Sequence, residues 1–178
     1  MRILALDPSF RNCGYTVWDT ENDTLLDAGV LKTSNTEFKA EHRLVSMQDL
    51  SCIMKTITGV KELIEKYKIK KVVAELPTGG SKSAKAAKSM SFCYGFVAGP
   101  IVFMGVDFKT VTPQAVKKFV YRTASGGKDG IMDFVTEKLN LETTGNKLTK
   151  WHICDKVFGK GDFEHIADSV VVYLATKE

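Results

Sequence analysis

The sequence predicts an α/β fold in which helices flank a mixed five-stranded sheet. Three short apolar segments near the N-terminus, residues 2–6, 13–18 and 25–31, are joined by links of a few turn-forming residues. Strands with such short links pair in an antiparallel meander. Two further strands, residues 71–74 and 107–111, then alternate with helical segments, which is typical of an α/β sheet. We therefore expect the first three strands to be antiparallel and the sheet as a whole to be mixed.

The helices are predicted from apolar residues at helical spacing and from capping residues. The longest has an apolar stripe of Leu50, Ile53, Met54, Ile57, Val60 and Ile64. Gly99-Pro100 should kink or break the second helix, and Thr112-Pro113 is a strong start for the third. Residues 143–163 have weak periodicity and are expected to form a loop with short turns. The expected helices span residues 41–67, 81–105, 113–122, 129–139 and 164–177.

Composition limits the classes of protein to consider. The chain has 178 residues, 44% of them hydrophobic and 26% charged, which suits one globular domain over residues 1–178. No stretch approaches the roughly 20 apolar residues that span a bilayer, and a strand pattern begins at Arg2, where a leader would lie. The spacing of the four cysteines indicates reduced thiols in a reducing compartment. These are Cys13, Cys52, Cys93 and Cys154.

Positive charge is concentrated in the middle of the chain. Residues 81–130 hold eight basic side chains, opposed only by Asp107 and Asp129. A basic zone on a near-neutral body suits a polyanionic partner, although lysines that merely solvate helix faces give the same count. The basic residues are Lys82, Lys85, Lys88, Lys109, Lys117, Lys118, Arg122 and Lys128.

Three acidic residues, widely separated in the chain, are the candidates for chemistry. Asp7 ends the first predicted strand and Glu75 follows the fourth, so both should emerge at one edge of the sheet if the strands are neighbours. Asp168 lies on the last helix, with His165 on the same face three residues before it. Taken singly, each has an ordinary explanation as a turn former, a solvated rim residue or a helix-surface pair. Their joint placement favours a site that only folding assembles.

Three converging carboxylates would repel one another unless a cation lies between them. Oxygen-rich sites select hard cations, so Mg²⁺ is expected, with Mn²⁺ as a substitute. Two such ions, roughly 3.5–4 Å apart, would activate a water and stabilise the leaving oxygen in an in-line attack on phosphorus.

Five motifs occur in order along nearly the whole chain. They are Ile3-Leu4-Ala5-Leu6-Asp7-Pro8 with Arg11, Gly14 and Tyr15; Val73-Ala74-Glu75; Thr112-Pro113 with Val116 and Lys117; Gly126-Gly127-Lys128 with Ile131; and His165 with Ala167-Asp168-Ser169-Val170. Together they resemble the RuvC-type Holliday-junction resolvases of the ribonuclease H-like superfamily. The resemblance implies a ribonuclease H-like fold and a magnesium-dependent endonuclease that cuts four-way DNA junctions. It also implies a homodimer in the cytoplasm, in a bacterial or phage-encoded setting.

The resemblance assigns roles to individual residues. Asp7 would bridge two metal ions, Glu75 would share one or both, and Asp168 and His165 would hold them from the helix. His165 could also transfer a proton. Lys117 and Lys128 match family lysines near the scissile phosphate, where one could stabilise developing negative charge. From the charge distribution, and not from the resemblance, we expect contacts with DNA phosphates, with a solvated helix face as the alternative, at Lys82, Lys85, Lys88, Lys118 and Arg122.

Three residues depart from the family pattern. Ser9 stands where the family usually has glycine. Phe10 replaces a smaller polar residue and is expected to pack, with a contact to DNA as the alternative. Thr78 stands where many members place an aromatic that wedges into the junction. A phosphate-contacting loop at residues 77–82 is expected instead, with looser selectivity for the junction.

Other functions remain open at this point. A nuclease for flaps, forks or RNA–DNA hybrids could use the same fold. A sugar-kinase-like ATPase also begins with a strand, an aspartate and a turn, but it needs two such domains and the chain has room for one. A non-catalytic DNA-binding module would not need its acidic residues.

Overall fold

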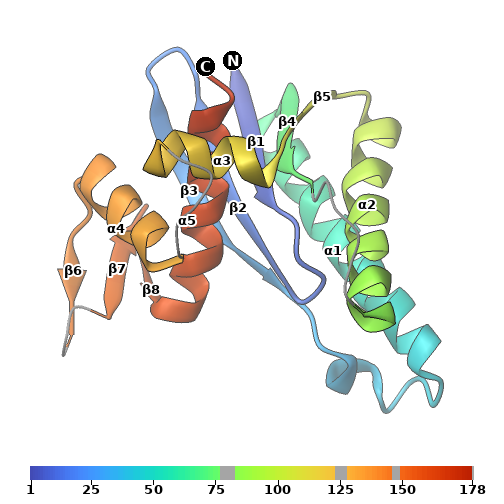
Figure 1. Cartoon of the computed structure of the whole chain (residues 1–178). Helices are drawn as coiled ribbons and strands as arrows, with labels where there is room; N and C mark the ends of the chain where they lie inside the picture. The colour runs from blue at the N-terminus through green and yellow to red at the C-terminus, as the bar shows by residue number, and fades with distance from the viewer. Residues whose placement is uncertain (77–82, 123–127, 146–148, 178) are drawn as a thin grey trace.

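The computed structural model of the protein describes residues 1–76, 83–122, 128–145 and 149–177. At its centre is a five-stranded sheet with the order β3-β2-β1-β4-β5 (Figure 1). β1, β2 and β3 are antiparallel, and β4 and β5 continue the sheet parallel to β1, so the predicted mixed sheet is confirmed. The strands are β1 Arg2–Asp7, β2 Asn12–Asp19, β3 Thr24–Lys32, β4 Lys71–Glu75 and β5 Asp107–Val111.

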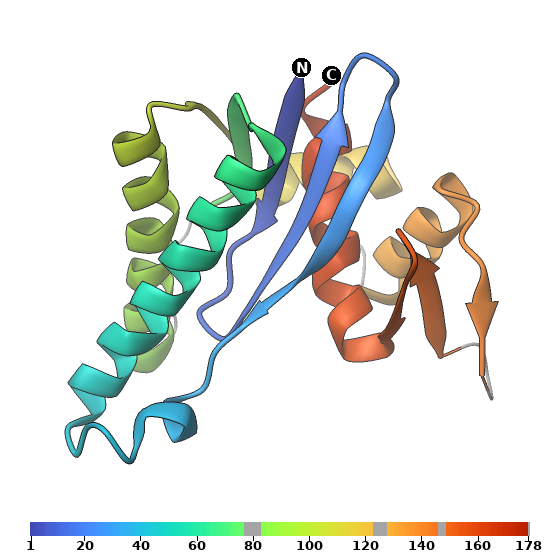
Figure 2. The ribbon, with the colours of Figure 1, turned by 180° about the vertical axis from the view of Figure 1, so that it is seen from behind.

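Helices cover both faces of this sheet (Figures 1 and 2). On one face, α1 (Val45–Tyr67) and α2 (Ala84–Met104) pack over a core that includes Leu4, Leu6 and Val72. On the other face, α5 (Lys160–Ala175) packs over a core that includes Ile3 and Ala5. Successive strand residues point to opposite faces, so Asp7 and Glu75 belong to the α5 face. The remaining helical elements are η1 (Asn35–Phe38), α3 (Pro113–Tyr121) and α4 (Lys128–Lys138).

Helix α2 differs from the prediction because it runs through Pro100 without a break. Pro100 lies one turn before the end of the helix, is buried against the core and removes a single backbone donor. The helix ends at Gly105, whose φ of +62° places it in the left-handed region that glycine adopts without strain. Packing of the last turn therefore outweighs the loss of one hydrogen bond.

Helix α2 is also long and apolar enough to cross a bilayer by length and composition alone, and no other helix of the described residues is. The sequence-based expectation of no such segment is therefore qualified. Alanines and glycines raise the apolar fraction of this helix. It is not a core helix, because only 22% of its most apolar stretch is buried. A single helix of this kind is weak evidence for a membrane.

The expectation that residues 143–163 form a loop is wrong. They contain a second, three-stranded antiparallel sheet and the start of α5. The turn at Cys154 and Asp155, with φ values of 48° and 59°, is of the left-handed kind that closes two-residue hairpins. Such short strands carry too little periodicity to be recognised. They are β6 Thr143–Thr144, β7 Lys150–Ile153 and β8 Lys156–Gly159.

Candidate active site

Asp7 and His165 form the centre of the candidate site. Asp7 is the last residue of β1, and His165 lies in the second turn of α5, which crosses the sheet above β1 and β2. Oδ2 of Asp7 lies 3.0 Å from Nδ1 of His165, within hydrogen-bond distance. Both side chains are mostly covered but reach solvent, with one fifth of each exposed. Two of the predicted site residues, 158 positions apart, are thus in direct contact.

Glu75 lies beside this pair. β1 and β4 are parallel neighbours with Leu6 opposite Ala74, so Asp7 and Glu75 follow at the same edge of the sheet. Burial, and then the negative charge of Asp7, raise the pKa of Glu75 to about 7, against a weaker opposing effect of Lys117. Two carboxylates on adjacent strands with such a pKa repel each other in a poorly hydrated place. The expected convergence of these two residues is therefore supported by their electrostatics.

The charge state of His165 responds to several acids. Its hydrogen bond with Asp7 raises the pKa of the imidazole, and burial opposes this. The charges of Glu164 and Asp168 raise it further. Asp168, one turn along α5, therefore acts on the pair through its charge. Glu164 has no place in the sequence-based site, although it immediately precedes His165.

Gly14 allows α5 to approach the sheet closely. It faces Asp7 across the β1–β2 ladder, and a Cβ there would lie 2.1 Å from the carbonyl oxygen of His165. No side chain fits in that space. Gly14 is part of the first sequence motif, but its contact with the final helix had no signal in the sequence.

The predicted ligands do not all meet at one point. Within the described ranges, no three His, Cys, Asp or Glu side chains are close enough to be grouped as ligands of one ion. Asp7 and His165 touch, whereas Glu75 and Asp168 are linked to them here by charge.

The predicted basic residues fall into separate places. Lys117 on α3 is half-buried. Its positive charge lowers the pKa of Glu75, so it lies near that carboxylate. Lys118 and Arg122 line a cavity with Ala175, near the end of α5, and are not brought to the Asp7 end. Lys128 begins α4, but its side chain lies outside the described residues.

The lysines of α2 lie at the end of the sheet where Asp7 emerges. Lys85 and Lys88 are exposed in the first two turns of the helix. Nζ of Lys88 lies 2.6 Å from Oδ2 of Asp49, so this lysine is held by a buried carboxylate. Lys82 and Thr78 lie outside the described residues.

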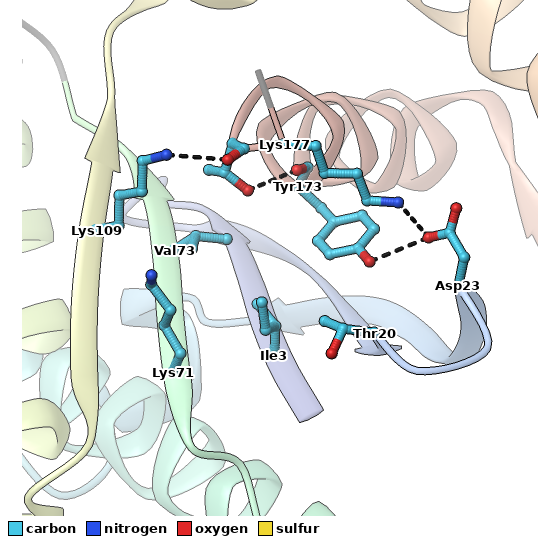
Figure 3. Close-up of a pocket in the computed structure, with 9 residues that line it drawn as sticks. Ile3, Thr20, Asp23, Lys71, Val73, Lys109, Tyr173 and Lys177 are labelled. Atoms are coloured by element: carbon cyan, nitrogen blue, oxygen red, sulfur yellow. Dashed lines mark hydrogen bonds and ion pairs between the residues drawn. The ribbon is translucent and has the colours of Figure 1, made fainter. Parts of the chain in front are cut away.

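A cavity of about 410 Å³ occupies the other end of the α5 face (Figure 3). It is lined by residues that include Ile3, Lys71 and Lys109 from the strands and Tyr173 from α5. Ile3 precedes Asp7 by four residues, or about 13 Å of strand. The cavity is thus separate from the Asp7–His165 pair.

A mixed sheet with this strand order, acidic residues ending its two central parallel strands and a histidine on the covering helix define a ribonuclease H-like enzyme. A family model described as crossover junction endodeoxyribonuclease RuvC matches residues 3–157. The chain belongs to this family.

Relatives of known name agree with this assignment. The chain is 29% identical over 149 residues to the crossover junction endodeoxyribonuclease RuvC of Brachyspira hyodysenteriae, covering 82% of this chain and 83% of the relative. It is 26% identical over 143 residues to the protein of the same name from Helicobacter pylori strain 26695, covering 79% and 83%.

Two solved structures share the fold. One is Thermus thermophilus RuvC in complex with a Holliday junction substrate, with a TM-score of 0.69, 18% identity, and 98% of this chain and 92% of that chain covered. The other is the yeast mitochondrial Holliday junction resolvase Ydc2, with a TM-score of 0.58, 14% identity, and 97% and 76% covered. At these identities the likeness shows the fold alone.

Proposed function

We propose that this protein, as a single nuclease domain, resolves four-way DNA junctions by paired symmetric nicks. The observation that carries the proposal is the contact of Asp7 with His165 beside Glu75, at the edge of a ribonuclease H-like sheet. Family membership supplies the reaction class. The bacterial origin of the relatives supports action in the cytoplasm.

The donor set fits a hard divalent cation. Asp7, Glu75 and Asp168 offer carboxylate oxygens and His165 offers an imidazole nitrogen, a combination that suits Mg²⁺ and also Mn²⁺. Burial and the charge of Asp7 raise the pKa of Glu75 more than Lys117 lowers it, so a bound cation would relieve the repulsion between these carboxylates. When bound, a pair of such ions supplies an activated water and charge stabilisation at the phosphate. Asp7 would serve both ions.

The remaining work falls to the side chains of the chain itself. Lys117, beside Glu75, is positioned to stabilise negative charge that develops on the cut phosphate. We assign the same role to Lys128 as the alternative. His165 orients Asp7 through their hydrogen bond, and its imidazole can hold or release a proton at Nδ1. Burial around Glu75 keeps bulk water from competing.

Symmetric cutting of opposing strands requires two sites related by a two-fold axis, so we propose a homodimer. Helix α2 supports this, because Tyr94, Val102 and Phe103 are exposed apolar residues on it, with Phe103 88% exposed. Exposed Gly95 and Ala98 on the same helix would let a partner helix approach closely. Exposed large apolar side chains of this kind are usual at subunit interfaces.

The dimer is tested by changing this helix. Val102→Glu places a charge on the exposed face, and the expected result is a monomer by light scattering at micromolar concentration. Val157→Glu is a matched control, because Val157 is 55% exposed on β8, away from α2. Full dimerisation of Val102→Glu would contradict the assigned surface.

Cleavage is tested with end-labelled synthetic four-way junctions in Mg²⁺. We expect paired nicks at symmetric positions, which Asp7→Asn abolishes while junction binding is kept. Binding should weaken steeply with salt, because phosphate contacts dominate the affinity. Flaps, forks and RNA–DNA hybrids in the same mixture would expose a less selective nuclease. Junction cleavage unaffected by Asp7→Asn would refute the assigned mechanism.

A further inference from the structure

A second recess lies beside the candidate site, on the α1/α2 face of the sheet. It has a volume of about 510 Å³, and we name it the turn cleft, after the β1–β2 turn that forms one wall. Ser9 in this wall is two residues after Asp7, and Phe92 in the opposite wall precedes Cys93. Phe10 of this turn packs on Phe92, with ring centres 4.8 Å apart, so this part of α2 lies against the segment that follows Asp7. The cleft is lined by Ser9, Phe10, Arg11, Asn35, Val45, Asp49, Lys85, Lys88, Ser89 and Phe92.

The walls of the turn cleft are held together by Asp49 of α1, which is only 5% exposed. Its Oδ1 accepts hydrogen bonds from Nδ2 of Asn35 at 2.9 Å and from Nη2 of Arg11 at 3.4 Å. Its Oδ2 accepts a hydrogen bond from Nζ of Lys88 at 2.6 Å. The donors come from three separate segments, so one carboxylate fixes the turn, η1 and α2 relative to α1. Two of these donors are cations, which a single carboxylate cannot neutralise.

Arg11 presents a flat, fixed surface to the cleft. Its guanidinium lies 4.0 Å from the centre of the Phe10 ring, and Nη1 donates to Sγ of Cys52 at 3.0 Å. Phe10 is itself buried and packs on Phe92, with ring centres 4.8 Å apart. One face of the guanidinium is therefore covered by a buried ring. The side chain remains 38% exposed, which leaves surface for a ligand.

We propose that the turn cleft binds one unpaired nucleotide of the branched DNA, next to the strand that is cut. This inference rests on the proposed function. Unstacked bases bind on guanidinium planes and aromatic rings, and Lys is a common phosphate ligand. Arg11 provides the plane for the base, and Lys85 at the rim provides a cation for the phosphate. At a four-way crossover the bases lose stacking on one side, so a nucleotide there can leave the duplex at low cost.

The size and chemistry of the recess agree with this ligand. Small-molecule sites of about 300–1,000 Å³ usually combine apolar walls with a few placed polar groups. Here two phenyl rings lie beside the amide of Asn35 and the hydroxyls of Ser9 and Ser89. Three cations and one carboxylate give the cleft a net positive charge. This charge favours a negatively charged nucleotide over an apolar ligand.

The test measures binding of junctions that lack one base, by the wild type and by the Arg11→Ala variant. Junctions carrying one abasic position each, at every nucleotide near the crossover, are bound by the whole protein in EDTA, which prevents cutting. For the wild type, we expect one position at which removal of the base weakens binding about tenfold. Arg11→Ala should weaken binding of the intact junction to a similar extent and should no longer distinguish that abasic junction. Arg2→Ala, at the opposite end of β1, is the matched control and should keep the abasic effect.

Two results would overturn the inference. One is wild-type binding that is equally strong at every abasic position. The other is an Arg11→Ala protein whose binding is still weakened to the full extent by removal of that base. The two changes would then act independently. In either case, symmetric junction cleavage by the wild type would show that the proposed function still stands. Circular dichroism of Arg11→Ala confirms that the variant is folded, and Lys85→Ala gives a second variant at an exposed position.

Discussion

The backbone carbonyl of His165 rests directly on Gly14. A Cβ at position 14 would lie 2.1 Å from that oxygen and 2.6 Å from the carbonyl carbon, far inside normal contact. Gly14 also faces Asp7 in the β1–β2 ladder. The absence of a side chain at Gly14 thus lets α5 lie close enough to the sheet for His165 to reach Asp7.

Gly14→Ala should therefore damage both stability and activity. The added methyl meets backbone, which cannot rotate away, so α5 must shift at a cost of about 1–3 kcal/mol of unfolding free energy. The shift would separate His165 from Asp7 and lower the cleavage rate. Denaturant unfolding and junction cleavage measure the two effects. Gly161→Ala on the same helix is the control, because a Cβ there meets nothing within 4 Å.

Lys117 and Lys118 are neighbours in sequence with different expected roles. Lys117 acts on Glu75, whereas Lys118 lines a cavity near the end of α5. Lys117→Ala should lower the rate of cleavage at saturating enzyme about 100-fold, because it removes the cation to which we assign stabilisation of the reacting phosphate. Lys118→Ala should change affinity or its salt dependence and leave that rate unchanged. Single-turnover kinetics separate the two, and equal rate losses in both variants would refute the distinction.

Asp27 should make folding sensitive to acid. Burial raises the pKa of this carboxyl, but hydrogen bonds from Lys156 and Tyr67 outweigh burial, so its pKa lies below the ordinary value of 3.8. Its stabilising effect is complete above that ordinary value and is lost as pH falls through the lower pKa of the folded state. In wild type, unfolding free energy should therefore fall as the pH is lowered from about 5 to 2. The fall should be shallower in Asp27→Asn and unchanged in Asp133→Asn, an exposed control on α4.

Trp151 should anchor the small sheet to the rest of the protein. Its ring stacks on Phe163 of α5, with centres 4.4 Å apart, and Nε1 donates to Oγ1 of Thr136 on α4 at 2.9 Å. Trp151→Ala should cost about 3–5 kcal/mol of unfolding free energy. Val157→Ala, on exposed β8, should change it by less than about 0.5 kcal/mol. Similar losses in both would show that the sheet does not depend on the stacking.

The five-stranded sheet could be predicted from the sequence because its strands are apolar and separated by clear turn residues. Both acidic strand ends could be recognised for the same reason, since Asp7 and Glu75 each follow an apolar run. Residues 143–163 were not, because strands of two to four residues have no period to detect and their hairpin turn uses Cys154 and Asp155. The predicted break at Pro100 was wrong because it considered only the backbone hydrogen bond that proline removes. Burial of the last turn keeps α2 continuous.

The parts of the site that escaped prediction all depend on contacts between distant segments. Gly14 looks like any strand glycine until α5 lies on it, and Asp49 looks like an ordinary acid of a helix surface. Its role follows only when Arg11, Asn35 and Lys88 converge on it. Lys118 and Arg122 were grouped with Lys117 by charge, but geometry separates them.

The separation of 158 positions between Asp7 and His165 has a consequence during synthesis. A ribosome-bound chain that has emerged only as far as β5 already contains both acidic strand ends, Asp7 and Glu75, but not yet His165. Fragments left by stalled translation would lack the helix that brings His165 to Asp7. The proposed active site can therefore assemble only after α5 has been synthesised.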